Sequence, residues 1–365
     1  MMHEALKEPP RAADTITRPQ AAAMSGPVRF IFTGSGKEYF GIWIVNVLLT
    51  ILTFGIYSAW AKVRRTRYFY DNTELAGSSF EYHGNPVAIL KGRLAAVGLI
   101  VAYNLAFRYS VALGFVIMFM MICAAPWLIW KSLQFKLYNS SYRGIRFAFR
   151  GTLYQSYKYY LALPLASLFT LYLLAPLTHQ RMKKYQHDES RFGQMPFSFH
   201  ASAGKFYLAY LIGASIAIGG VVVLSALFFG GILASFTGST MNAAMAPPTI
   251  LFFVSLYVWM FTLFPIFLAI IQNLIWNNTR LGAHQFGCSL KWGTMLFIAF
   301  TNLLGILLTL GLYTPFAQIR SMKYRIESMS LQPQGSLDEF IAGKQAEQSA
   351  TSEGMSDLLD FDLSL

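Results

Sequence analysis

The sequence predicts an all-α integral membrane protein with about seven transmembrane helices, internal repeats and short strand-like inserts between the spans. Its 365 residues are 55% hydrophobic, 16% aromatic and only 13% charged, whereas about a quarter of the residues in a soluble domain are charged. Long apolar runs and a repeated polar pattern at their ends support the same fold class. Such a composition excludes a soluble enzyme.

The predicted spans are runs of roughly 20 apolar residues, long enough to cross a hydrocarbon core of about 30 Å as helix. They cover residues 40–60, 87–107, 111–130, 159–178, 206–236, 250–276 and 295–316. The second run is the weakest, because Lys91 and Arg93 fall near its start. These runs place a polytopic membrane domain at residues 28–330.

Both ends of the chain are predicted to be disordered tails. Residues 1–27 are rich in Ala, Pro and charges, and residues 331–365 are rich in Ser, Gln and acids. The net charge is +12 although the C-terminal tail is acidic, so the membrane domain itself is strongly basic. A basic excess beside membrane spans indicates anionic lipid headgroups rather than nucleic acid. The expected partners are therefore membrane lipids, and the oligomeric state is left open.

An internal repeat organises the domain. Residues 46–70 align without gaps on residues 302–326, and a third copy surrounds Thr170 and Pro176. Two looser copies contain Pro126 and Pro265. After each of four copies a glycine leads into a segment in which aromatic and other side chains alternate, which is typical of short strands or hairpins. These segments begin at Gly77, Gly144, Gly193 and Gly282.

Three copies share a basic and aromatic helical face, because spacings of three, four and seven residues bring side chains to one side of a helix. An acid follows one turn later, at Asp71, Asp188 or Glu327. The face is interpreted either as a site for anionic lipid or as a packing surface between repeats. Ordinary topology-setting charge is the third interpretation. The candidate residues are Arg64, Arg67, Tyr68, Arg181, Lys184, Tyr185, Arg320, Lys323 and Tyr324.

Three stretches resemble a known family. They are Phe-Thr-Gly-Ser-Gly-Lys-Glu-Tyr-Phe-Gly-Ile-Trp at residues 32–43, Leu-Thr-Phe-Gly-Ile-Tyr-Ser-Ala-Trp-Ala-Lys-Val-Arg-Arg at 52–65, and Gly84-Asn-Pro with Lys91-Gly-Arg93. On these residues the chain resembles the YjgN-like multi-pass inner-membrane proteins of bacteria, whose function is uncharacterised. Ala59 stands where that family is expected to have proline. The resemblance implies a bacterial inner-membrane location and supplies no reaction, ligand or site.

No chemical site is predicted. Gly34-Ser-Gly-Lys37 departs from a phosphate-binding loop, because Glu38 takes the place of the required Ser or Thr. The histidines show no metal-binding spacing, no nucleophile elbow is present, and Cys123 and Cys288 are isolated. The sequence therefore predicts no catalytic residue, no cofactor and no metal, and the protein is not expected to be an enzyme.

Two functions are left open. A transporter or solute-passage protein is favoured slightly, because three spans followed by three more would invert the repeat in the membrane, and such inversion is common in transporters. The predicted spans contain no Asp or Glu, which argues against coupling to protons or sodium. The alternative is a non-catalytic scaffold, or an envelope protein that binds anionic lipid.

The predicted topology contains a conflict. If every run crosses once, the basic segments after the first, third and seventh runs share one side, and those after the fourth and sixth lie opposite. Arg181, Lys183 and Lys184 then violate the positive-inside rule. Either the repeat is inverted or one run re-enters, and residues 159–178, which contain Pro164, are the most prone to break. The segments at residues 64–67 and 131–150 are expected to face the cytoplasm.

Overall fold

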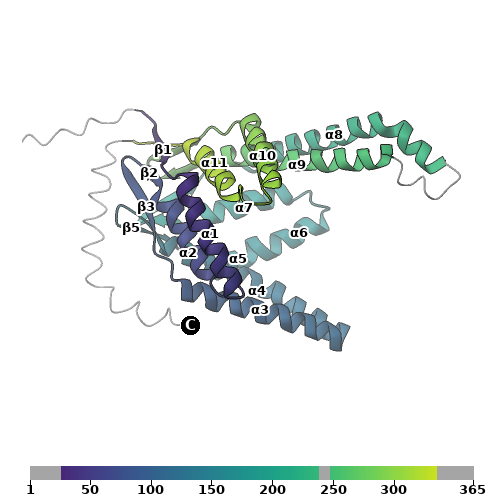
Figure 1. Ribbon diagram of the computed structural model, residues 1–365. Helices are drawn as coiled ribbons and strands as arrows, with labels where there is room; N and C mark the ends of the chain where they lie inside the picture. Colours follow the sequence, from purple (N-terminus) through teal and green to yellow (C-terminus); the bar gives the residue numbers. More distant parts are fainter. Residues whose placement is uncertain (1–25, 238–246, 335–365) are drawn as a thin grey trace, which may run out of the picture.

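The computed structural model describes residues 26–237 and 247–334 and combines a closed antiparallel barrel with a ring of helices (Figure 1). The predicted disordered tails lie largely outside these residues. Ten strands form the barrel in the order β1-β10-β9-β8-β7-β6-β5-β4-β3-β2. They are β1 (Val28–Phe32), β2 (Thr73–Leu75), β3 (Ser78–Tyr82), β4 (Ser140–Tyr142), β5 (Ile145–Phe149), β6 (Ser190–Phe192), β7 (Met195–Phe199), β8 (Thr279–Leu281), β9 (His284–Cys288) and β10 (Met329–Gln332).

The same order of elements occurs in five successive segments: a longer strand, a helical hairpin and a shorter strand. The hairpins are α1 (Gly36–Leu52) with α2 (Ser58–Asp71), α3 (Pro86–Tyr109) with α4 (Val111–Tyr138), α5 (Leu153–Tyr157), η1 (Lys158–Ala162) and α6 (Leu163–Phe169) with α7 (Ala175–Asp188), α8 (Ala203–Thr237) with α9 (Pro247–Trp276), and α10 (Trp292–Leu308) with α11 (Thr314–Glu327).

Tight turns join the short strand of one segment to the long strand of the next. Between β2 and β3 these are Ala76 and Gly77, with φ of 48° and 72°. Positive φ at both central residues is the signature of a type I′ hairpin turn, which matches the twist of paired strands. Each segment is thereby hydrogen-bonded to the following one, and β1 closes the circle on β10 with Val28 opposite Leu331.

All five hairpins project from the same end of the barrel, because each long strand runs into the first helix and the second helix returns to the short strand. Neighbouring helices pack on one another around the circle, and α11 packs on α1. Figure 1 shows that α3–α4 and α8–α9 reach farthest from the barrel. Among the described residues these are the 4 helices long and apolar enough to span a membrane.

The prediction of an all-α fold with about seven spans is wrong. The runs at 40–60, 159–178 and 295–316 each contain a chain reversal, since α1, α6 and α10 end at Leu52, Phe169 and Leu308 and a second helix then runs back. The reversals carry left-handed residues, for example Gly311 at φ 95°. The residues at the turn tips are themselves apolar and exposed. The sequence therefore stays apolar through the reversal, and two short helices were predicted as a single span.

The predicted strand-like inserts are in fact the walls of the barrel. Their alternation is visible locally, but strands of three to five residues are stabilised by partners far away in sequence, as Val28 is by Leu331. The third hairpin is interrupted as its proline predicts. A π-helical turn at Lys158–Ala162 precedes Pro164, whose ring nitrogen cannot donate a helical hydrogen bond.

Candidate functional site: an aromatic ring on the barrel axis

The interior of the barrel is aromatic. Side chains alternate between the two faces of a strand, and the middle inward-facing residue of every long strand is a phenylalanine. These residues form a hydrophobic core together with inward side chains of the short strands, such as Leu75, Phe192 and Leu331. The five phenylalanines are Phe30, Phe80, Phe147, Phe197 and Phe286.

The five phenylalanines form a closed ring. Each phenyl group has a neighbour on either side at a centroid distance of 6.1–6.5 Å, and neighbouring planes differ by only 15–31°. Rings whose planes contained the barrel axis would turn by a fifth of a circle from one to the next. The small angles therefore indicate that the phenyl groups lie across the barrel, with their edges toward its axis.

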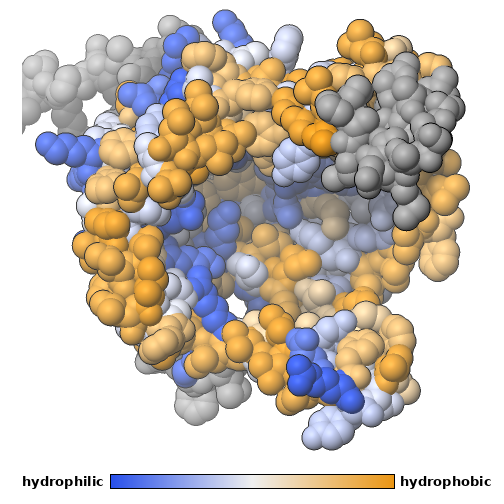
Figure 2. Space-filling view, turned by 45° about the vertical axis from the view of Figure 1, so that its right-hand side comes forward, coloured by the Kyte–Doolittle hydropathy of each residue, from blue (hydrophilic) through white to orange (hydrophobic). Residues whose placement is uncertain are grey.

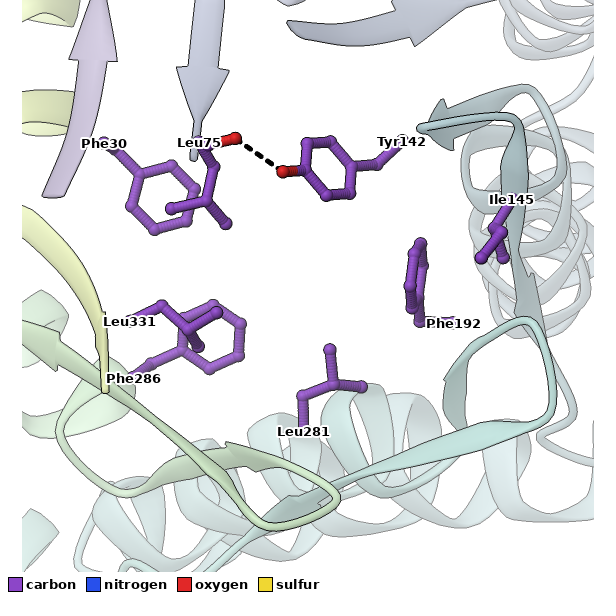
Figure 3. Packing of buried hydrophobic residues seen from close by; sticks show 8 residues of the cluster. All are labelled: Phe30, Leu75, Tyr142, Ile145, Phe192, Leu281, Phe286 and Leu331. Atoms are coloured by element: carbon purple, nitrogen blue, oxygen red, sulfur yellow. Dashed lines mark hydrogen bonds between the residues drawn. The ribbon is translucent and has the colours of Figure 1, made fainter. Parts of the chain in front are cut away.

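A cavity of about 170 Å³ lies inside this ring and is lined by apolar and aromatic side chains. Figure 3 shows core residues pointing inward from the strands around this space. Tyr142 brings a hydroxyl group, but that group donates to the carbonyl oxygen of Leu75 at 2.5 Å. The lining offers water almost no hydrogen-bonding groups, so the centre of the barrel disfavours water.

Residues from the last turns of α9, α11 and α7 cover the helix-side mouth of the barrel. Trp276 and Ile326 pack against the barrel core, and the Trp276 ring lies 5.4 Å from Phe286. The His187 ring packs against the rings of Trp276 and Phe199, with distances between ring centroids of 5.6 and 5.4 Å. Burial, followed by the charge of Lys183, lowers the pKa of His187 to about 4, so its imidazole is neutral at physiological pH.

Beyond this mouth the helices surround a hollow. Figure 2 shows hydrophilic side chains on its wall and hydrophobic ones over the outer surfaces of the hairpins. Lys183 and Gln272 stand one helical turn farther from the barrel than His187 and Trp276, on the same helix faces. Their polar groups therefore lie above the aromatic ring.

The tyrosines of the predicted face fasten each second helix to the start of the first helix in its segment. The Tyr68 hydroxyl accepts from the backbone amide of Ser35 at 2.9 Å, and Tyr185 donates to the carbonyl oxygen of Thr152 at 2.9 Å. Ser35 and Thr152 are the N-cap residues of α1 and α5. Tyr324 accepts from the amide of Lys291, the N-cap residue of α10, at 2.8 Å.

Each copy of the face contains two basic residues, and the second one, Arg67 or Lys184, connects its segment to the next. Arg67 Nε donates to the carbonyl oxygen of Tyr82 at 3.3 Å, and Lys184 Nζ to that of Phe199 at 3.4 Å. Tyr82 and Phe199 end the long strand of the next segment. Ion pairs one turn along the helix hold Lys184 to Asp188 at 2.7 Å and Lys323 to Glu327 at 3.8 Å.

The first basic residue of each copy, Arg64, Arg181 or Arg320, does not have the same contacts in all three copies. Arg320 donates to Thr301 Oγ1 at 2.7 Å and lies over the Phe297 ring, whereas Arg64 and Arg181 are exposed. The side chains of each copy thus bond within their own segment or to the long strand of the next one. The three copies stand on separate helices, α2, α7 and α11, rather than meeting in one site.

Sequence reasoning missed the phenylalanine ring and the polar residues above it. The signal was present, because a phenylalanine stands two residues before the end of each long strand, but alternation alone does not say that these strands converge. In the part of the chain that the structure describes, no group of three or more His, Cys, Asp or Glu residues could hold a metal ion.

Comparisons with known proteins identify relatives named as inner membrane proteins, in agreement with the apolar helices of this chain. Residues 27–358 match a family described as bacterial protein of unknown function (DUF898). The inner membrane protein YjgN of Salmonella typhimurium (strain LT2) is 34% identical over 145 residues, 40% of this chain and 37% of the relative. YjgN of Escherichia coli K12 is 34% identical over 121 residues, 33% of this chain and 30% of the relative. The chain therefore spans only about a third of these relatives. No solved structure matches it.

Proposed function

Because this chain belongs to the DUF898 family and is an inner-membrane protein, we propose that it forms a passage for small solutes across that membrane. The proposed path follows the common axis of the barrel and the ring of helices. One observation carries the proposal: five segments of the chain each contribute one phenylalanine to a closed ring around an apolar cavity on this axis. Apolar constrictions of this kind gate channels by excluding water.

The proposed membrane placement follows from hairpin length. Helices α3, α4, α8 and α9 cross the bilayer, while the three shorter hairpins enter it and return. Their exposed apolar tips, including Phe54 and Leu310, then lie in hydrocarbon. The barrel stands at one surface, and all second helices return to it. In this placement the basic segments at the ends of the second helices lie on one side, which would remove the topological conflict and supports a cytoplasmic position for the barrel.

The covalent connections suggest how the constriction would open. Each ring phenylalanine lies on a strand that leads within a few residues into the first helix of a hairpin, as Phe30 leads through β1 to α1. A shift of one hairpin in the bilayer therefore moves one member of the ring. Widening the ring would let water fill the cavity and end the barrier.

The test is flux through the protein reconstituted in liposomes. Phe147→Ser places a hydroxyl group in the apolar cavity, and we expect at least a tenfold faster release of trapped small ions than from the parent protein. Phe147→Leu keeps the cavity apolar and is expected to retain the barrier. Ala148→Ser adds the same hydroxyl group to the outward face of the same strand and serves as the matched control.

Folding is checked for each variant by gel filtration and by its melting temperature. The proposal is wrong if folded Phe147→Ser protein releases ions no faster than the parent or than Ala148→Ser. A second ring variant, Phe80→Ser, repeats the test on another segment. Equal flux from all variants would leave the barrel as a purely structural core.

Anionic-lipid binding without passage is the second candidate. It is supported by the exposure of Arg64 and Arg181 on helices that return toward the membrane surface. The support is narrower than for passage, because Tyr68, Tyr185 and Lys184 already have backbone partners within the protein.

A further inference from the structure

We propose that the passage selects small anions, and that a cationic cluster of Lys136, Lys183 and Arg325 above the aromatic ring is the selective site. This inference rests on the proposed function and names its substrate class. The three residues come from three different segments of the chain, on α4, α7 and α11.

Lys183 is tied to the barrel mouth through a short series of contacts. It stands one helical turn before His187, which contacts Trp276 at 5.6 Å. Trp276 in turn lies 5.4 Å from Phe286, a member of the phenylalanine ring. The Lys183 side chain is half-buried, and its amino group donates to Gln186 Oε1 at 3.0 Å.

Arg325 stands nearer the barrel on α11, at the position that Gln186 takes on α7. It directly precedes Ile326, which packs against the barrel core, and its Nε donates to Gln272 Oε1 at 3.4 Å. Gln272 stands one turn before Trp276 on α9. Lys183 and Arg325 therefore both border the mouth of the barrel, and each donates to an amide oxygen rather than to a carboxylate.

Lys136 brings a second positive charge close to Lys183. Burial, followed by the charge of Lys136, lowers the pKa of Lys183. A nearby like charge disfavours the protonated form of an amine. A bound anion would relieve both the repulsion and the poor solvation of the half-buried amino group.

Acidic residues are confined to the barrel end of the described chain. Each of them lies on a barrel strand, in the first or last turn of a helix, or at a helix C-cap. The acids are Glu38, Asp71, Glu74, Glu81, Asp188, Glu189 and Glu327. Basic residues continue farther along the helices, for example at Arg64, Arg93 and Arg181. Beyond their barrel-end turns, the helices therefore carry basic residues without matching acids among the described residues.

A concave basic surface with apolar walls focuses a positive potential, which concentrates anions and repels cations. Rings of Lys and Arg select anions and phosphate in known pores by the same physics. Gln272 can orient toward an anion through its NH₂ group, whereas the Gln186 NH₂ group already donates to the Tyr160 hydroxyl at 2.7 Å. Chloride and inorganic phosphate are therefore the probes that the site should accept, and rubidium is the cation that it should reject.

The first measurement compares chloride and rubidium flux in liposomes containing the Phe147→Ser protein. We expect chloride to pass at least tenfold faster than rubidium. Adding Lys183→Glu and Arg325→Glu should lower this ratio by at least tenfold. Arg280→Glu makes the same charge change on the outward face of β8, at an exposed side chain, and should leave the ratio unchanged.

The second measurement needs no flux. Sodium phosphate should raise the melting temperature of the detergent-solubilised parent protein more than sodium sulfonate buffer of equal ionic strength, and Lys183→Gln with Arg325→Gln should abolish the difference. Absence of flux in every ring variant refutes the passage alone, and the phosphate effect then decides the anion site. An unselective flux, or a ratio and a phosphate effect that survive both substitutions, refutes the anion site while the passage stands.

Discussion

At the scale of single residues, the repeated tyrosines connect the two helices of a hairpin through hydrogen bonds. Tyr68 and Tyr185 are buried, and each hydroxyl group lies against the N-cap residue of the first helix of its own hairpin. Burial is the main reason that the pKa of Tyr68 is raised to about 12. These hydroxyl groups remain protonated at physiological pH and act as neutral hydrogen-bonding groups.

We predict that Tyr185→Phe lowers the free energy of unfolding by about 1 kcal/mol, because the carbonyl oxygen of Thr152 loses its hydroxyl donor. Tyr68→Phe should have a similar effect, since it leaves the Ser35 amide without this acceptor. The measurement is the melting temperature in detergent. Tyr109→Phe is the matched control, because Tyr109 is 85% exposed at the end of α3. A loss of stability as large in Tyr109→Phe would mean that the buried hydrogen bonds contribute nothing specific.

At the scale of elements, the short hairpins depend on their turns. Gly55 and Gly311 have φ of 91° and 95°, and a Cβ atom added at either position would meet no other atom within 4 Å. The cost of a side chain there is therefore backbone strain alone. These turns convert an apolar run of span length into two helices that run in opposite directions.

We predict that Gly311→Ala destabilises the protein by about 1–2 kcal/mol, the cost of left-handed backbone for a residue with a Cβ atom. Gly41→Ala is the matched control. Gly41 also has open space around it but lies inside α1 with helical backbone, where alanine is favoured by about 1 kcal/mol. Melting temperatures of the two variants should move in opposite directions. If both rise, the reversal between α10 and α11 is not strained in the native protein.

At the scale of the whole molecule, closure of the barrel places every inter-segment turn at the end opposite the helices. The turns near Ser78 and Gln194 therefore share one end of the barrel, and in the proposed placement one side of the membrane, although an odd number of predicted spans separates them. The tip between α3 and α4, at Tyr109, projects the other way. This topology differs from that of seven single crossings.

We predict that Ser78→Cys and Gln194→Cys are both protected from an impermeant thiol reagent in intact cells, whereas Tyr109→Cys is labelled. The protein used should carry Cys123→Ser and Cys288→Ala, so that only the new thiol reacts. After cell lysis all three positions should become reactive. Labelling of just one of Ser78→Cys and Gln194→Cys in intact cells would restore single crossings and rule out five hairpins of common direction.

Local patterns in the sequence predicted a good part of this protein. Hydropathy predicted a membrane protein, and the runs at 87–107, 111–130, 206–236 and 250–276 match α3, α4, α8 and α9. The alternating segments after Gly77, Gly144, Gly193 and Gly282 correctly indicated extended chain. These features depend on burial in lipid and on backbone preference, which act over a few residues and leave a direct trace in residue order.

Closure, direction and the candidate site depended on tertiary structure. A hydropathy profile cannot show where the chain turns back when the turn residues are as apolar as the helices, as they are at Phe54 and Leu310. Pairing of Val28 with Leu331 joins residues at opposite ends of the domain, and no local period encodes that contact. The phenylalanines were visible one at a time, but their convergence on one axis follows only from a closed barrel. By itself, then, the sequence determined which segments are apolar enough for the membrane and which are extended, whereas long-range strand pairing decided how five such segments enclose a common axis.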